Sequence, residues 1–143
     1  MDNISKEMRT EYMCIFCDII DGKIPSKKIY EDEKCIAILD ISQLTKGHTL
    51  VIPKQHFSGI DDCDEETLRH LISVTRKLAV RITERLNAPG FHILNNCNPV
   101  ANQSVMHMHF HIIPRYSEND CVSMDFTPDH EEYDLEEIRQ QLI

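Results

Sequence analysis

The chain has 143 residues, with a hydrophobic content of 41% and a charged content of 27%, which are ordinary values for one globular domain. Its formal net charge is −9, but nine acidic residues and no Lys or Arg lie in residues 117–137. The other 122 residues carry 15 acidic and 15 basic side chains. This balance leaves no basic surface for a nucleic acid polymer, so we expect none as a partner.

The N-terminal residues 1–12 are polar, and we expect a loose segment there followed by a single domain over residues 13–143. No stretch has the apolar core of a signal peptide, and no apolar run reaches membrane-spanning length, so no membrane partner is expected. Six cysteines without a secretion signal indicate a reducing compartment, and the cytoplasm is the expected location.

Cys14 and Cys17 form a C-x2-C pair at the start of an expected short helix. The chain has no second C-x2-C, so the pair alone cannot make a four-cysteine zinc site. A redox dithiol, a bystander role and a metal site completed by distant histidines all stay open, since structural zinc accepts two Cys and two His.

Three short strands are expected at residues 29–30, 35–39 and 47–53, because β-branched and apolar residues gather there between polar turns. Asp40 follows the second of these strands, where a loop residue can face a ligand. His48 and His56 flank the third strand. Each of these histidines alone is more often structural than functional.

A long helix is predicted over residues 62–87, where leucine, isoleucine and alanine recur at three- and four-residue spacing. Asp62 with Glu65 suits a helix N-cap and its partner, and Asn87 begins the stop signal. A fourth strand is expected at residues 91–94. It is followed by an amide-rich loop, residues 95–104, which can supply hydrogen bonds to an anion.

Residues 105–114, V-M-H-M-H-F-H-I-I-P, are predicted to form the strand around which the chain is organised. The strict period of two sends Met106, Met108, Phe110 and Ile112 to one face, which should pack on a core, and three histidines to the other. Three alternate histidines are hard to explain as structure, because imidazole titrates near neutrality, binds metals and acts as a nucleophile or base. A short amphipathic helix is expected at residues 134–142.

These motifs together resemble the histidine triad (HIT) family, which carries H-x-H-x-H followed by apolar residues. The resemblance covers nearly the whole chain. It includes C-I-F-C-D-I-I-D-G-K-I-P-S from Cys14, G-H-T-L-V-I-P-K-Q-H from Gly47, Q-S-V from Gln103 and I-I-P-R-Y from Ile112. The cysteine pair favours the Hint-like branch of bacterial type.

The resemblance implies an α+β domain with a five-stranded antiparallel sheet, one long helix and one or two short ones, which pairs as a homodimer. It also implies hydrolysis of purine nucleoside 5′-phosphoramidates or mixed anhydrides through a nucleotidyl-histidine. By position His109 would be the nucleophile, and the catalytic group would further include His111, His48 and Ser104. The nucleotide-binding residues would be Phe16, Ile19, Ile38, Asp40, Ile41, Asn96, Gln103, Ser104, His109 and His111.

The resemblance further implies a structural zinc ion held by Cys14, Cys17, His56 and His107, a closed set with no position for water. The chain departs from the family at Asn98 and Asn102, where glycine is usual. Asparagine tolerates a positive φ better than other non-glycine residues, so we expect the loop geometry to be kept.

Three other interpretations stay open. The three alternate histidines could ligate a catalytic zinc ion, although side chains nearly in line converge poorly on one metal. The substrate could instead be a dinucleoside polyphosphate or a capped nucleotide. The protein could also bind nucleotides without acting on them.

Overall fold

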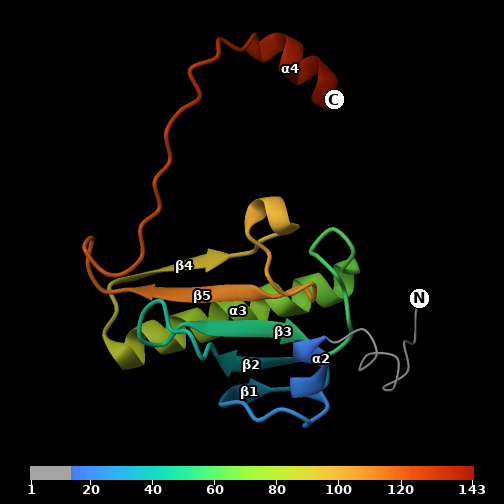
Figure 1. The fold of residues 1–143 in the computed structure, drawn as a ribbon, viewed down its shortest axis with the longest axis vertical. Coiled ribbons are helices and arrows are strands. Elements are labelled where there is room, and N and C mark those ends of the chain that lie inside the picture. The colour runs from blue at the N-terminus through green and yellow to red at the C-terminus, as the bar shows by residue number, and fades with distance from the viewer. Residues whose placement is uncertain (1–13) are drawn as a thin grey trace.

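The computed structural model describes residues 14–143, so the expected loose segment 1–12 lies outside the described residues. Five strands form one antiparallel sheet in the order β1-β2-β3-β5-β4, which confirms the predicted α+β class (Figure 1). None of the helices within residues 14–143 is long and apolar enough to span a membrane. The elements are α2 (Ile15–Ile20), β1 (Lys28–Glu31), β2 (Cys35–Leu39), β3 (Thr49–Pro53), α3 (Glu65–Leu86), β4 (Gly90–Leu94), the 3-10 turn η1 (Pro99–Ala101), β5 (Phe110–Arg115) and α4 (Leu135–Leu142).

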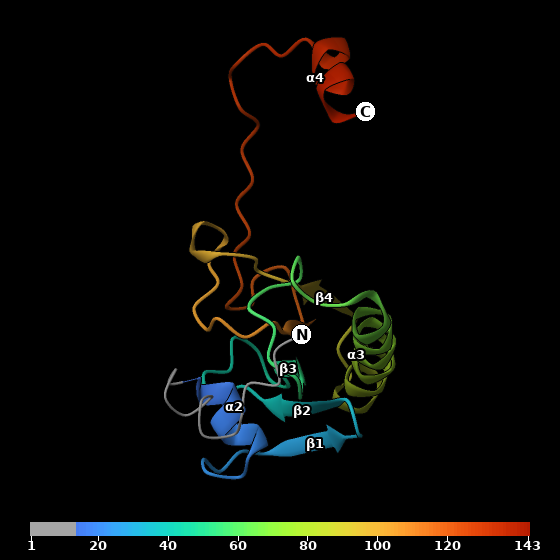
Figure 2. The same ribbon diagram turned by 90° about the vertical axis from the view of Figure 1, so that its right-hand side faces the viewer.

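The long helix α3 covers one face of the sheet, and the short helix α2 lies against part of the other (Figures 1 and 2). Side chains of β2 alternate between these two layers, as its period of two requires. Cys35 and Ala37 join the core cluster of α3, whereas Ile36 and Ile38 join the cluster of α2. Because both of its faces are covered, β2 is apolar at every position rather than at every second one.

The N-cap of helix α3 lies two residues later than predicted. Asp64, not Asp62, is the N-cap, and its carboxylate accepts the Thr67 N–H at 3.0 Å. Asp62 instead accepts hydrogen bonds from the Ser58 backbone N–H and hydroxyl. The stop at Asn87 is confirmed, since this residue adopts the left-handed conformation (φ 56°) that commonly ends a helix.

The predicted histidine strand is shorter than residues 105–114, because β5 begins only at Phe110. Before Phe110 the backbone forms hydrogen bonds with loop residues rather than with a neighbouring strand. The Met108 N–H donates to the carbonyl oxygen of Phe57 at 2.7 Å, and the Asn95 amide donates to that of His109 at 3.0 Å. The alternation nevertheless holds for Met108 and Phe110, which are buried beneath α3 with Ile112. The prediction was wrong for Met106, which is 43% exposed because it lies four residues before the strand begins.

The C-terminal segment leaves the body after β5 and ends in the predicted short helix, now seen as α4 (Figures 1 and 2). Its base is fixed by Arg115, whose guanidinium makes an ion pair with Asp120 at 2.7 Å. The Tyr116 hydroxyl also donates to the carbonyl oxygen of Lys46. Beyond residue 122 the chain runs away from the sheet, and α4 buries none of its residues.

Candidate functional site

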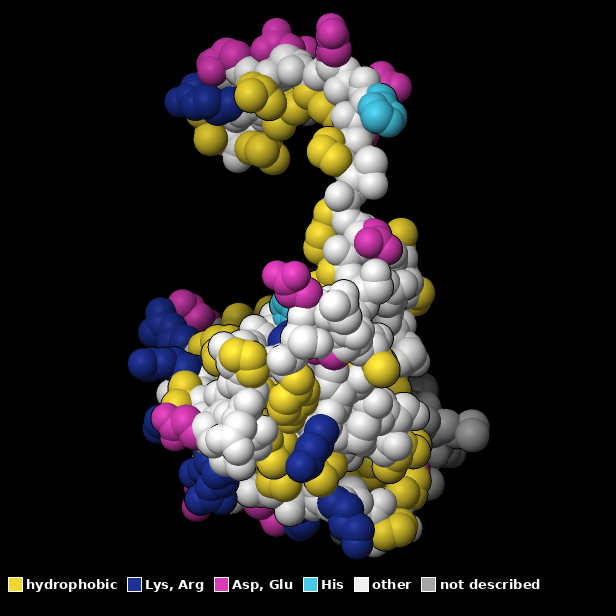
Figure 3. Space-filling model, turned by 90° about the vertical axis from the view of Figure 1, so that its left-hand side faces the viewer, with side chains coloured by type: hydrophobic (Ala, Val, Ile, Leu, Met, Phe, Trp, Pro, Cys, Tyr) yellow, Lys and Arg dark blue, Asp and Glu magenta, His cyan; other side chains and the backbone are white. Residues whose placement is uncertain are grey.

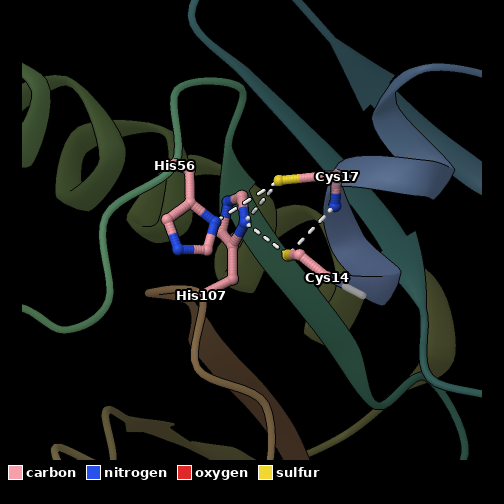
Figure 4. Close-up of side chains that lie close together, drawn as sticks. All are labelled: Cys14, Cys17, His56 and His107. Atoms are coloured by element: carbon pink, nitrogen blue, oxygen red, sulfur yellow. Dashed lines mark hydrogen bonds between the residues drawn. The ribbon is translucent and has the colours of Figure 1, made fainter. Parts of the chain in front are cut away.

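Cys14, Cys17, His56 and His107 come together between α2, the end of β3 and the segment before β5 (Figure 4). The Nδ1 of His107 lies 3.3 Å from the Cys14 sulfur and 3.5 Å from the Cys17 sulfur, and the Nδ1 of His56 lies 3.3 Å from the Cys17 sulfur. A tetrahedral zinc ion with ordinary bond lengths separates its sulfur and nitrogen ligands by about 3.6 Å. The cluster therefore has nearly the dimensions of a Cys2His2 zinc site.

The protonation of this cluster also suits a metal ion. The Nε2–H of His107 donates to the carbonyl oxygen of Pro53 at 2.8 Å, which leaves Nδ1 with a free lone pair toward the sulfurs. A hydrogen bond with the Cys17 thiol, assisted by those to His107 and His56, outweighs burial and lowers the pKa of the Cys14 thiol. A thiolate and a neutral imidazole are the forms that bind zinc.

A cavity of about 360 Å³ lies beside this cluster, between α2, the loop after β2 and the triad segment. Its wall is largely apolar, and its polar lining residues include Asp40, Ser104 and two of the triad histidines. This is the usual composition of a small-molecule pocket. The site residues predicted from the sequence that line it are Phe16, Ile19, Ile38, Asp40, Ile41, Ser104, His109 and His111.

His109 lines the cavity with one nitrogen already engaged. Its Nδ1 lies 2.7 Å from the carbonyl oxygen of His107, an acceptor only, so Nδ1 carries the proton and Nε2 carries the lone pair. The ring is 5% exposed and packs edge-on against Phe16, with ring centroids 5.0 Å apart. The side chain is therefore held in one orientation and one tautomer.

His48 lies behind His111 and does not line the cavity. The Nδ1 of His48 accepts the Leu44 N–H at 3.3 Å, so its proton is on Nε2, which lies 2.9 Å from the Nδ1 of His111. That hydrogen bond leaves the His111 proton on Nε2. Asp40, whose Oδ2 lies 3.8 Å from the Nε2 of His48, stands beside the pair.

The imidazoles of His48, His109 and His111 are held in the neutral form. Burial lowers the pKa of His109 and of His48, and it lowers the pKa of His111 to about 4, with nearby His109 and His48 adding to the effect. Desolvation disfavours the charged form of a base, which explains the common direction. At neutral pH the site therefore offers the lone pair on Nε2 of His109 and the Nε2–H donor of His111, while the N–H of His48 is used in its hydrogen bond to His111.

Gln103 and Asn96 do not line the cavity, although both were predicted to bind the nucleotide. Both ends of the Gln103 amide bond to backbone: Oε1 accepts the Asn98 N–H at 2.7 Å, and Nε2 donates to the carbonyl oxygens of Ser58 and Val105. The Asn96 amide points to the carbonyl oxygen of Asn102. Both side chains therefore form hydrogen bonds to the backbone instead of facing the cavity.

The loop around η1 has the backbone that its asparagines were expected to allow. Asn98 and Asn102 adopt φ values of 73° and 68°, so the expectation of positive φ at the usual glycine positions is confirmed. Other wall residues were missed from the sequence. Ile24 and Ser26 lie in the motif that begins at Cys14, Leu50 in the one from Gly47 and Val105 in the one from Gln103, but none of them was assigned a role in the site.

The triad histidines do not converge on one point. Among the described residues, His107 groups with the cysteines, whereas His111 groups with His48 and Asp40. The geometry therefore does not support the alternative of one metal ion shared by three alternate histidines.

Comparisons with known proteins agree with this geometry. The HIT domain family model matches residues 21–118. An uncharacterised HIT-like protein of Methanocaldococcus jannaschii is 44% identical over 130 residues, covering 91% of this chain and 98% of that protein. An adenylylsulfatase of Arabidopsis thaliana is 37% identical over 109 residues, covering 76% of this chain and 55% of that protein.

Three solved structures share the fold. A HIT family protein of Bacillus anthracis has 47% identity and a TM-score of 0.84, covering 90% of this chain and 92% of its own. A histidine triad nucleotide-binding protein of Candida albicans has 33% identity and a TM-score of 0.80, covering 90% and 94%. A zinc-bound histidine triad protein of Mycobacterium smegmatis has 40% identity and a TM-score of 0.73, covering 82% and 85%. Motif order, sheet topology and these matches agree, and the chain belongs to the HIT domain family.

Proposed function

We propose that this protein hydrolyses purine nucleoside 5′-phosphoramidates or mixed anhydrides, with His109 as the nucleophile. One observation carries the proposal: the Nδ1–H of His109 is bonded to the carbonyl oxygen of His107, and the ring lines the cavity. A neutral imidazole with a fixed tautomer is a good nucleophile near pH 7. The lowered pKa of His109 keeps it in that form.

The reaction would proceed in two displacements. In the first, Nε2 of His109 bonds to the α-phosphorus while the bond from phosphorus to the leaving amine or acyl oxygen breaks. The leaving group keeps the bonding electrons and gains a proton from the Ser104 hydroxyl or from water. In the second, water attacks phosphorus, the bond to Nε2 breaks, and the proton lost by water restores the first donor. Splitting the reaction makes each step easier.

The remaining groups are assigned to binding and positioning. The Nε2–H of His111, set by its hydrogen bond with His48, would donate to a phosphate oxygen. The Asp40 carboxylate would accept both ribose hydroxyls, since a carboxylate accepts several hydrogen bonds. The purine would lie against the apolar wall, which includes Phe16 and Ile38.

We assign a structural zinc ion to Cys14, Cys17, His56 and His107. The near-tetrahedral sulfur–nitrogen distances and the zinc-bound Mycobacterium smegmatis relative support this assignment. Four protein ligands leave no open position, so the ion would hold α2 to the triad segment and take no part in the chemistry. A homodimer and a cytoplasmic location complete the proposal. No disulfide joins the six cysteines, all of which lie within residues 14–143, and this suits a reducing compartment.

A specific observation favours mixed anhydrides with an inorganic leaving group. The relative from Arabidopsis thaliana is named an adenylylsulfatase, and adenylyl sulfate is a mixed anhydride of a nucleotide. The same attack by His109 would then expel sulfate. Adenylyl sulfate therefore belongs in the substrate panel beside the phosphoramidates and a dinucleoside polyphosphate.

The proposal is tested by measuring hydrolysis of this panel by the wild type, by His109→Ala and by the control His130→Ala, which changes an exposed histidine of the C-terminal segment. Removing the nucleophile should lower the rate roughly 10⁴-fold while nucleotide binding persists. The control should match the wild type. An inert wild type, or an unimpaired His109→Ala, would overturn the phosphoramidase assignment, and hydrolysis of the dinucleoside polyphosphate alone would change the substrate class.

A further inference from the structure

A second group of metal-binding side chains lies on the opposite face of the sheet from the Cys14–Cys17 cluster. It consists of Asp32 in the turn between β1 and β2, Cys35 at the start of β2, and His70 on α3. One possible ligand atom from each residue lies within 4.8 Å of the other two. Cys35 packs in the core beneath α3, whereas Cys14 and Cys17 pack with α2 (Figure 2). The two groups are therefore separate sites.

The carboxylate of Asp32 lies at the centre of this group and receives more hydrogen-bond donors than it can accept well. Its Oδ1 accepts the backbone N–H groups of Lys34 at 2.7 Å and of Cys35 at 2.8 Å. Its Oδ2 lies 2.6 Å from the Nε2 of His70, 2.7 Å from the Tyr30 hydroxyl and 3.6 Å from the Cys35 sulfur. Five donors thus converge on about four lone-pair sites. A cation in place of the thiol and imidazole protons would remove this excess.

The charge of Asp32 also lacks a permanent counterion. Within residues 14–143 its ion-pair partner is His70, which is charged only when protonated. The neighbouring Lys34 is paired with Glu66 instead. The carboxylates of the C-terminal segment stand on its outside (Figure 3), whereas the side chain of Asp32 is only 23% exposed. A divalent cation would balance the charges of this carboxylate and a Cys35 thiolate together.

The three donor types select the kind of ion. Zinc binds thiolate, imidazole and carboxylate, whereas magnesium and calcium prefer oxygen ligands. A tetrahedral zinc ion separates a sulfur from an oxygen ligand by about 3.5 Å, close to the 3.6 Å between Cys35 and Asp32. The 2.6 Å contact of Asp32 with His70 must widen to about 3.3 Å. The side chain of His70 is 35% exposed, so solvent rather than packed protein lies on one side of it and allows this movement.

We propose that Asp32, Cys35 and His70 bind a second zinc ion, with water as the fourth ligand. The ion would join the β1–β2 turn to α3. The Tyr30 hydroxyl and the two backbone N–H groups would keep the carboxylate aimed at it, because such supporting hydrogen bonds orient metal ligands. Binding would release the thiol proton of Cys35 to solvent and shift the His70 proton from Nε2 to Nδ1. The site is independent of the chemistry at His109.

The second ion should bind more weakly than an ion at the Cys14–Cys17 cluster. Burial, with the charge of Asp32 adding to it, raises the pKa of the Cys35 thiol to about 12, so zinc competes there with a firmly held proton. The Cys14–Cys17 cluster also offers a fourth protein ligand and a second sulfur. A chelator should therefore remove the ion at Asp32, Cys35 and His70 first.

Equilibrium dialysis of the full-length protein against a series of zinc concentrations, followed by metal analysis, tests this proposal. Asp32→Asn, Cys35→Val and His70→Gln should each bind one zinc ion fewer per chain than the wild type at saturation. Tyr30→Phe should keep the ion but weaken its binding roughly tenfold, because it removes a bond that orients the carboxylate. Cys63→Val is the control, since Cys63 packs against the same core but lies outside the group, and it should match the wild type.

The comparison with the wild type makes the result independent of whether the Cys14–Cys17 cluster holds zinc. A deficit of one ion in the three ligand variants supports the proposal. Equal zinc content in the wild type and in His70→Gln, which changes a partly exposed side chain, would overturn it. Cobalt(II) added to the unsubstituted protein gives a second measurement. A weakly bound cobalt ion with a sulfur-to-cobalt charge-transfer band supports the site, and a weakly bound ion without that band contradicts it.

Discussion

The Nδ1–H of His109 donates to the backbone carbonyl oxygen of His107 at 2.7 Å, while the ring of His107 lies among the sulfurs of Cys14 and Cys17. His109, which lines the cavity, is thus oriented by His107, which belongs to the proposed zinc site. Phe16 joins the two regions a second time, since its ring packs edge-on against both histidines. A substitution of Cys14 or Cys17 should therefore disturb the orientation of His109, the proposed nucleophile.

Cys14→Ser should remove one zinc ligand and lower both stability and activity. We expect loss of bound zinc and a decrease of about 3 kcal/mol or more in the free energy of unfolding, because a structural zinc ion contributes directly to folding. Metal analysis after gel filtration and urea unfolding measure the two effects. Cys121→Ser, at an exposed cysteine, is the control. Unchanged zinc content in Cys14→Ser would show that the ligand set is wrong.

Stability should fall as the pH decreases from neutrality toward 4. Burial lowers the pKa of His111 to about 4 and also lowers that of His109, so the unfolded chain binds more protons than the folded one below the ordinary histidine pKa of about 6.5. Urea unfolding at a series of pH values measures the loss. The slope between pH 6.5 and 4 should be smaller in His111→Gln than in the wild type, and equal slopes would argue against this prediction.

Gln103→Leu should destabilise the protein even without nucleotide. It removes part-buried hydrogen bonds to the Asn98 N–H and to the carbonyl oxygens of Ser58 and Val105, and each such bond contributes about 1 kcal/mol to stability. Urea unfolding of the nucleotide-free protein measures the effect. The comparison variant is Ser104→Ala, at an exposed residue on the cavity, which should leave stability nearly unchanged. A Gln103→Leu variant that kept full stability but lost nucleotide affinity would instead favour direct phosphate binding.

Asn98 should prefer replacement by glycine over replacement by alanine. Its φ of 73° with ψ of 156° lies in a region that is nearly restricted to glycine. We expect Asn98→Gly to be about 1–2 kcal/mol more stable than Asn98→Ala, by urea unfolding. The same pair of substitutions at Asn95, outside the positive-φ residues, serves as a control. Equal stabilities at Asn98 would mean that the loop adopts another backbone.

The sequence predicted the features that depend on local periodicity. The alternation around Phe110 correctly assigned Met108 and Ile112 to the core, because successive side chains of an extended chain point to opposite faces whether or not it is bonded in a sheet. Local periodicity could not predict that β5 begins only at Phe110. The hydrogen bonds that replace the sheet come from Phe57 and Asn95, which are distant in sequence.

Other misses arose where several residues satisfy the same local rule. Asp62 and Asp64 both suit a helix N-cap, and only the bond from Ser58 to Asp62 decides between them. An amide in a loop can face a ligand or the backbone, and the carbonyl oxygen of Ser58 turns Gln103 inward. The Cys2His2 set followed from family resemblance alone, since spacing left the partners of the C-x2-C pair open.

The central claim is that His109 becomes covalently nucleotidylated. Mixing the protein with adenosine 5′-phosphoramidate, quenching within the first turnover and mapping the peptides by mass spectrometry tests it most directly. We predict an adenylyl group on His109 that forms and decays at rates consistent with turnover and is absent from His109→Ala. Turnover without an adduct on any residue, or an adduct on another histidine, would contradict the account.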